Sequence, residues 1–352
     1  MGVPEESAKQ TQSERPELYN GLTRVQHMVE KGVSAVPEAF IQPPHMRSSA
    51  RSLNCDLQIP VIDMALLQQG GEGKMQVQAD ITHACEEWGF FRKFFALSPE
   101  EKEMYKHQSS GGAVGYGRVF EEYRKPDEVK EWLDRLTLDL SSAKDPSQTL
   151  NLVINNPPRF QDVYEEFGNA IYELGKKLMA IISEELGQAP DFLLSKSGNE
   201  KLFMRTMFNY YPPCPHPELV MGSPPHSDGS ALTILQQGDV PGLQVLHNGV
   251  WVPIPPTSDH AFVVNMGDVL QIISNGRFKS VLHRAVVQKT SRISIANFMA
   301  PGVDVVMQPA AELCNETNPA AYKSVTFGDF LKFVVGQGYG RSESRAVDSF
   351  RL

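Results

Sequence analysis

The sequence Pro224-Pro225-His226-Ser227-Asp228 is followed, 55 residues after Asp228, by His283 and then by Arg292-Ile293-Ser294. In an extended strand, residues two apart point to the same side, so the imidazole of His226 and the carboxylate of Asp228 can bind one metal ion together. His283 can then come from a neighbouring strand. Two histidines and one carboxylate leave the opposite side of a metal free, which favours a ferrous ion that also binds a co-substrate and dioxygen.

A bare His-x-Asp pair also arises by chance, and a single histidine in a strand is more often a core or surface residue than a ligand. We give this ordinary interpretation to the six other histidines, including His216, His247 and His260. The segments around His226, Asp228 and His283 are what separate these three from the rest.

Several further motifs occur in a fixed order along the chain. They are Ile59-Pro60-Val61-Ile62-Asp63, Cys85-Glu86-Glu87-Trp88-Gly89-Phe90-Phe91, Asn209-Tyr210-Tyr211-Pro212-Pro213-Cys214-Pro215, Leu232-Thr233-Ile234-Leu235-Gln236, Asn265-Met266-Gly267-Asp268 and Ser274-Asn275-Gly276. Together they resemble the plant 2-oxoglutarate- and iron(II)-dependent dioxygenases, the group that contains anthocyanidin synthase, flavonol synthase and the poppy alkaloid demethylases. The resemblance covers roughly residues 20 to 350. It implies a jelly-roll core of the double-stranded β-helix type.

The resemblance also implies an activity. His226, Asp228 and His283 would be the catalytic Fe(II) ligands, and 2-oxoglutarate and dioxygen would be consumed to give succinate and carbon dioxide while an organic substrate is oxidised. Ascorbate would serve as the reductant. Related halogenases carry a small residue where this chain has Asp228, so the carboxylate predicts hydroxylation, desaturation or oxidative demethylation.

In the same family, an Arg-x-Ser pair that matches Arg292 and Ser294 binds the distal carboxylate of 2-oxoglutarate, and an Asn-x-Tyr pattern that matches Asn209 and Tyr211 adds further contacts. Strand alternation supports this assignment, because an arginine that alternates with Ile293 in a core strand is costly unless it meets an anion. The guanidinium fork suits a carboxylate. The alternatives are a structural arginine–carboxylate pair and a core tyrosine packed before a proline turn.

The substrate is less defined by the sequence. Phe298 shares a strand face with Arg292 and resembles the aromatic residue that flavonoid-oxidising members stack on their substrate, and Met207 shares a face with Asn209. However, Arg135 and Thr137 stand where flavonoid enzymes tend to carry aromatic residues. We expect an aromatic, flavonoid- or phenylpropanoid-like metabolite or an alkaloid, with Arg135 either a partner for an acidic group or a solvated arginine.

Composition limits the other classes of function. The chain has 352 residues, 41% of them apolar, and a net charge of −9 without a basic run, so nucleic acid is not an expected partner. No apolar stretch reaches the ~20 residues of a membrane span. The four cysteines are widely separated, which favours a reducing cytosol over a disulfide framework. We expect a cytoplasmic monomer.

Periodicity predicts an α+β organisation. Apolar residues recur every three or four positions from Phe160 to Ile182, which indicates a long amphipathic helix that ends near Gly187. Short strands follow from Leu202, with a hairpin at Asn275-Gly276 that joins runs 269–274 and 277–287, and a closing helix spans Phe327 to Val335. The expected divisions are a disordered tail (1–20), a mixed helical region (21–195), the jelly-roll domain (196–325) and a carboxy-terminal helix and tail (326–352).

One departure from the family stands out. Members follow Trp-Gly-Phe-Phe with an Asn-His-Gly strand and a helix, whereas this chain passes directly from Phe91-Arg92 to Lys93-Phe94-Phe95, so roughly twenty residues are absent. A divergent paralogue, a splice form and an incomplete sequence all fit this gap. We expect Phe90, Phe91, Phe94 and Phe95 to cover it. The gap also keeps open a second hypothesis, a non-catalytic small-molecule-binding protein on the same jelly roll.

Overall fold

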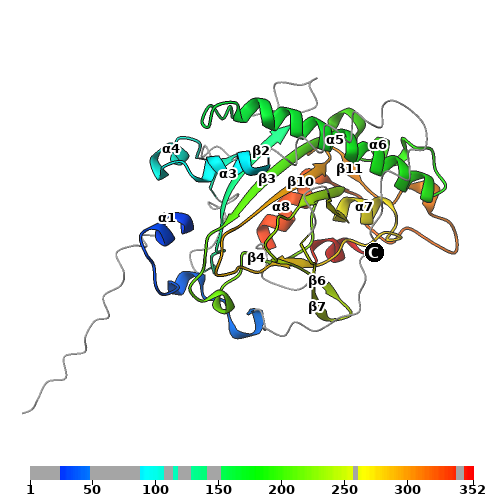
Figure 1. The fold of residues 1–352 in the computed structure, drawn as a ribbon. Coiled ribbons are helices and arrows are strands. Elements are labelled where there is room, and N and C mark those ends of the chain that lie inside the picture. The colour runs from blue at the N-terminus through cyan, green and yellow to red at the C-terminus, as the bar shows by residue number, and fades with distance from the viewer. Residues whose placement is uncertain are drawn as a thin grey trace, which may run out of the picture.

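The structure is a computed structural model that describes residues 24–47, 88–106, 114–117, 128–140, 152–256, 261–337 and 345–352. The expected disordered tail and the motif at residues 59–63 lie outside these ranges. The helices are α1 (Val25–Glu30), α3 (Trp88–Phe95), α4 (Pro99–Glu103), α5 (Phe160–Glu185), α6 (Phe192–Lys196), α7 (Asp268–Ile273) and α8 (Phe327–Gln337). Figure 1 shows them around two β-sheets.

The larger sheet has the strand order β1-β2-β3-β10-β5-β8, and every pairing within it is antiparallel. Its strands are β1 (Gly115–Tyr116), β2 (Asp134–Leu140), β3 (Phe203–Tyr211), β10 (Arg292–Ala300), β5 (Leu232–Gln236) and β8 (Val263–Met266). The long strands β3 and β10 pair over their whole length, from Arg292 opposite Tyr211 to Ala300 opposite Phe203. Two strands from the amino-terminal part of the chain, β1 and β2, therefore belong to the same sheet as the carboxy-terminal strands.

The smaller sheet has the order β4-β9-β6-β7, also antiparallel. Its strands are β4 (Ser223–His226), β9 (His283–Ala285), β6 (Leu243–His247) and β7 (Val250–Pro253), and a separate two-stranded sheet joins β11 (Val306–Met307) to β12 (Val325–Thr326). The larger and smaller sheets form the jelly-roll core, so the α+β fold predicted from the sequence is confirmed.

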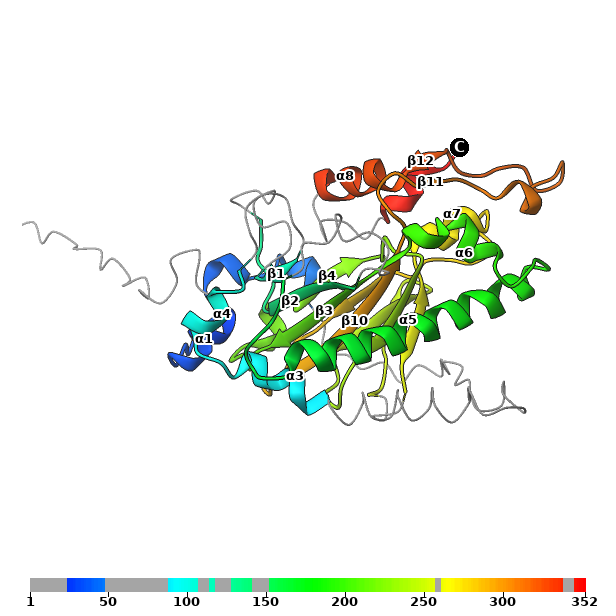
Figure 2. The same ribbon diagram turned by 90° about the horizontal axis from the view of Figure 1, so that it is seen from above.

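Helix α5 covers one face of the larger sheet, as the apolar repeat predicted. It runs along β2, β3, β10 and β5 (Figures 1 and 2) and buries Phe160, Val163, Phe167 and Ile171. The helix ends at Glu185 and Gly187 adopts a positive φ of 74°, a backbone conformation typical of glycine just past a helix. Each large apolar side chain buried in this layer contributes roughly 1.5–3 kcal/mol.

Helix α3 is formed by the segment where the sequence departs from the family pattern. The side chains of Phe91, Phe94 and Phe95 are all buried, and that they cover a gap stays a prediction; the side chain of Phe90 lies outside the described residues. The ring of Phe91 lies 4.6 Å from that of Phe208 on β3 and 5.4 Å from that of Phe160 on α5. An aromatic cluster therefore links α3 to the central sheet and its covering helix.

The predicted hairpin at Asn275-Gly276 is wrong. Residues Asp268–Ile273 form helix α7, and the two turn residues do adopt positive φ values of 52° and 77°, but they end this helix instead of joining two strands. Every side chain of α7 is buried, so the run carries no amphipathic period from which a helix could be recognised.

The carboxy-terminal residues pack against helix α7. Helix α8 confirms the predicted closing helix, and Figure 2 shows it on the opposite side of the larger sheet from α5. A short 3₁₀ helix, η9 (Ala346–Phe350), follows, and Tyr322 forms an isolated bridge with Arg351. In the part of the chain that the structure describes, none of the helices combines the length and apolar character needed to cross a bilayer.

We expect Phe91→Ala to lower the free energy of unfolding by about 3–5 kcal/mol, because it removes a buried ring from the contact between α3, α5 and β3. Met104→Ala is the matched control, since the Met104 side chain is 70% exposed; its effect should stay within about 0.5 kcal/mol. Urea unfolding measures both. Equal stability of the two variants would show that the contacts of Phe91 with α5 and β3 do not stabilise the fold.

Candidate active site

His226 and His283 lie side by side on neighbouring strands of the smaller sheet. They are directly opposite residues on the antiparallel strands β4 and β9, and their ring centroids are 4.2 Å apart. Asp228 follows β4 in irregular chain, with its Oδ1 atom 3.7 Å from Nε2 of His226 and 3.5 Å from Nε2 of His283. One ligand atom from each of the three residues lies within 4.8 Å of the others, so together they could hold a metal ion.

Hydrogen bonds orient the three side chains. Nδ1 of His226 lies 2.8 Å from the carbonyl oxygen of Pro224, and Nδ1 of His283 lies 3.1 Å from that of Val281. A carbonyl can only accept, so in each ring Nδ1 carries a proton and Nε2 is the atom turned toward Asp228. This is the tautomer that a metal-binding histidine needs.

The second oxygen of Asp228 is held by residues that the sequence analysis missed. Oδ2 accepts hydrogen bonds from Oγ1 of Thr233 on β5, at 2.7 Å, and from Nδ2 of Asn265 on β8, at 2.8 Å. These two residues are opposite neighbours in the larger sheet. Their place in the motifs Leu-Thr-Ile-Leu and Asn-Met-Gly-Asp was visible, but nothing in the spacing connects them to Asp228.

The pKa values of the cluster favour metal binding. Burial, followed by the neighbouring His283, lowers the pKa of His226 to about 4, and Arg135 has a smaller effect in the same direction. Burial opposes ionisation of Asp228, but the two imidazoles and the hydrogen bonds from Asn265 and Thr233 outweigh it and lower the pKa of Asp228. At neutral pH, the site therefore contains neutral imidazole at His226 and an ionised carboxylate, which are the protonation states of metal ligands.

Arg292 lies on the inner face of the larger sheet and is 2% exposed. Its Nε donates to the carbonyl oxygen of Val240 at 3.1 Å, and its guanidinium lies 5.0 Å from the ring centroid of Tyr211, the opposite residue on β3. Its Nη1 atom is buried without a hydrogen-bond partner, and among the described residues no carboxylate forms an ion pair with it. Burial lowers the pKa of Arg292, and the neighbouring Tyr211 offsets only part of this effect.

The register of β10, β3 and β2 places the other predicted residues on the same face. Ser294 is opposite Asn209, and Asn209 is also opposite Arg135, whose Nε donates to Oδ1 of Asn209 at 2.6 Å. Met207 is opposite Ala296, one step further along the sheet, and Phe298 lies beyond it, opposite Arg205. All the residues predicted to bind 2-oxoglutarate or substrate therefore share one sheet face with Arg292.

The loop that carries Asp228 is packed directly against the start of α7. The amide of Asp268 donates to the carbonyl oxygen of Asp228 at 2.8 Å, and the amide of Gly267 donates to that of Ala231 at 2.9 Å. A Cβ atom on Gly267 would lie 2.0 Å from the carbonyl oxygen of Ser230 and 2.9 Å from that of Asp228. Only glycine permits this approach of the two backbones.

Comparisons with known proteins identify related sequences and a related structure. A family model described as "2OG-Fe(II) oxygenase superfamily" matches residues 203–301. Jasmonate-induced oxygenase 1 of Arabidopsis thaliana is 34% identical over 90% of this chain and 84% of its own length. Oxoglutarate-dependent flavonoid 7-O-demethylase 1 of Ocimum basilicum is 33% identical over 88% and 86%.

A solved structure described as JOX2 in complex with 2OG, Fe and JA has a similar fold. It superposes with a TM-score of 0.79 at 31% sequence identity, and the match covers 94% of this chain and 98% of JOX2. The likeness therefore extends well beyond the segment that the family model matches.

We expect Gly267→Ala to lower both stability and divalent-metal affinity, because the added methyl group must push the Asp228 loop away from α7. Gly336→Ala on α8 is the control, since a Cβ there meets nothing within 4 Å; it should be neutral or stabilise by up to about 1 kcal/mol. Thermal unfolding and Mn(II) titration of both variants check this. Unchanged metal affinity in Gly267→Ala would show that the backbone contact does not position Asp228.

Proposed function

The chain belongs to the 2OG-Fe(II) oxygenase superfamily, and from this premise we propose that His226, Asp228 and His283 bind its catalytic Fe(II). The donor set supports this assignment, since each Nε2 and the Oδ1 atom point into one space and the remaining polar atoms are already engaged. Iron bound there would activate dioxygen for the coupled oxidation of 2-oxoglutarate and of a C–H bond in the substrate.

One observation supports the proposed 2-oxoglutarate site most strongly. Arg292 is a buried cation whose Nη1 has no partner, and an uncompensated buried charge persists only where a ligand compensates it. We assign its guanidinium to the distal carboxylate of 2-oxoglutarate. Ser294 beside it and Tyr211 opposite it offer hydroxyl groups to the same carboxylate, and Asn209 completes the set.

The residues around Asp228 determine which of its oxygens can bind the metal and which type of oxidation we expect. Thr233 and Asn265 occupy Oδ2 of Asp228, so only Oδ1 is available to the metal and the opposite side stays open to 2-oxoglutarate and dioxygen. With a carboxylate at this position the chain itself supplies the third ligand, which supports hydroxylation, desaturation or demethylation in place of halogenation.

For the substrate we propose a small specialised metabolite, aromatic or alkaloid-like, that contacts Phe298 and Met207 and places an acidic group near Arg135. Arg135 is close enough to His226 to lower the pKa of that histidine. Among the described residues, the one hydrogen bond of the Arg135 side chain is to Asn209, and it forms no ion pair with a carboxylate. The matches to a flavonoid demethylase and to a complex that contains JA support small-molecule oxidation of this kind.

A metabolite library tests this proposal. Turnover would be detected as gain of one oxygen, loss of two hydrogens or loss of a methylene group in the mass spectrum. Acidic metabolites should be enriched among the hits. A set of hits without any acidic group would contradict the role of Arg135.

We further propose a cytoplasmic monomer that uses ascorbate as reductant and has no nucleic-acid or membrane partner. The net charge of −9 supports a small-molecule function, and the free thiols of Cys214 and Cys314 support a reducing compartment. Ascorbate dependence of turnover and gel filtration test these points. No feature of the described residues favours the non-catalytic alternative, and succinate release from 2-oxoglutarate would exclude it.

We expect replacement of His226, Asp228 or His283 by alanine to abolish turnover without unfolding the chain, because each change removes one of three protein ligands. Circular dichroism monitors the fold, and calorimetric titration with Mn(II) monitors the site. His247→Ala is the control, because His247 is exposed at the end of β6. Wild-type metal affinity in two of the three ligand variants would overturn the assignment.

We expect Arg292→Lys to raise the KM for 2-oxoglutarate far more than the KM for the organic substrate. Lysine keeps the positive charge but loses the planar fork that binds a carboxylate through two hydrogen bonds. Steady-state kinetics with each substrate varied in turn measure the difference. If both constants stay at their wild-type values, Arg292 is a structural residue.

A further inference from the structure

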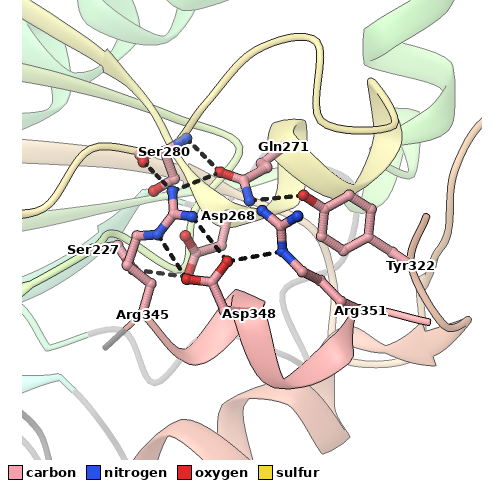
Figure 3. A network of polar contacts seen from close by, with 8 residues as sticks. All are labelled: Ser227, Asp268, Gln271, Ser280, Tyr322, Arg345, Asp348 and Arg351. Carbon is pink, nitrogen blue, oxygen red and sulfur yellow. Dashed lines mark hydrogen bonds and ion pairs between the residues drawn. The ribbon is translucent and has the colours of Figure 1, made fainter. Parts of the chain in front are cut away.

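A polar network connects the last residues of the chain to helix α7 and to the segment before β9, and a hydrogen bond from α7 reaches Ser227, the residue between His226 and Asp228 (Figure 3). At its outer end, Nε and Nη2 of Arg345 bind the two oxygens of Asp348 at 3.0 and 2.8 Å. Arg351 adds a hydrogen bond of 3.1 Å to Oδ1 of Asp348. This fork fixes the guanidinium of Arg345, so that its Nη1 points toward α7 and the segment before β9.

One arm of the network leads to His283. Nη1 of Arg345 donates to the carbonyl oxygen of Ser280 at 2.7 Å and to Oε1 of Gln271 at 3.1 Å. The same Oε1 accepts the backbone amide of Ser280 at 2.8 Å, while Nε2 of Gln271 donates to the hydroxyl of Tyr322 at 2.9 Å. Both backbone polar groups of Ser280 are therefore held three residues before His283.

A second arm leads to His226 and Asp228. Helix α7, which carries Gln271, begins with Asp268, and Oδ2 of Asp268 accepts a hydrogen bond of 3.1 Å from Oγ of Ser227, the residue between the two ligands. The amide of Asp268 also binds the carbonyl oxygen of Asp228 at 2.8 Å. Because α7 is buried on all sides, its two ends move together, and it joins the chain segments of all three ligands.

We propose that Arg345 and Asp348 form a carboxy-terminal latch that positions the metal ligands through α7. The inference rests on the proposed metal site and adds positioning residues that lie outside the family model's match and do not touch the metal. Ligand geometry must hold within about 0.5 Å for tight binding. Residues that orient ligands typically alter metal affinity about 10- to 100-fold when they are removed.

The test compares metal binding in the full-length apoprotein with that in Arg345→Ala, Arg345→Lys and Ser227→Ala. Lys332→Ala is the control, because it breaks an exposed ion pair with Asp329 on α8 outside the network. Mn(II) titration gives the affinity, the visible spectrum of the Co(II) form reports ligand geometry, and thermal unfolding of the apoprotein reports stability.

We expect Arg345→Ala to weaken Mn(II) binding about tenfold or more and to shift the Co(II) bands. Arg345→Lys should recover only part of the affinity, since lysine cannot bind Asp348, Gln271 and Ser280 at once. Ser227→Ala should weaken binding by a smaller factor, and Lys332→Ala should match the wild type.

Wild-type affinity and an unshifted Co(II) spectrum in Arg345→Ala would overturn the latch, even if the variant melts at a lower temperature, because the network would then be only a structural clamp. If Arg345→Ala does not fold, Arg345→Lys and Ser227→Ala decide by the same measurements, and wild-type values in both overturn it. Failure of the wild-type chain to bind Mn(II) would instead refute the proposed metal site on which the latch rests.

Discussion

The rest of the site depends on the contacts of the Asp228 carboxylate, because its two oxygens contact residues on different sheets. Oδ1 faces His226 and His283 on the smaller sheet, and Oδ2 is bound by Thr233 and Asn265 on the larger sheet. One buried charge thus joins the two sheets of the jelly roll. Its ionised state is stabilised by the groups that fix its direction, so charge and geometry are set together.

Arg292 shows the opposite situation, a buried charge that, in our proposal, is compensated by a bound carboxylate. Tyr211 lies against its guanidinium and Val240 accepts one hydrogen bond, but Nη1 has no partner. Burial of such a group opposes folding, whereas binding of a carboxylate gains from the absence of competing partners. Binding of 2-oxoglutarate at Arg292, as proposed, would give a physical reason for retaining this unfavourable arrangement.

In the amino-terminal region, aromatic side chains of helix α3 pack against the larger sheet and its covering helix α5. Helix α3 places Phe91 against α5 and β3, and Phe94 against α5, so buried aromatic area joins these three elements. His226 and His283 lie on the smaller sheet. The aromatic packing of α3 is therefore separate from the proposed metal-binding cluster.

The sequence by itself determined the family, the jelly-roll class, helix α5 and the set of residues on one sheet face, because period-two and period-3.6 patterns report directly on burial. Only the tertiary structure decided that residues 268–273 form a helix, since a fully buried run has no polar side to reveal its period. It also decided that Thr233 and Asn265 hold Asp228 and that Arg345 reaches Ser280. Those contacts join residues far apart in the chain, and their partners are chosen by how the sheets and α7 pack, which no local pattern encodes.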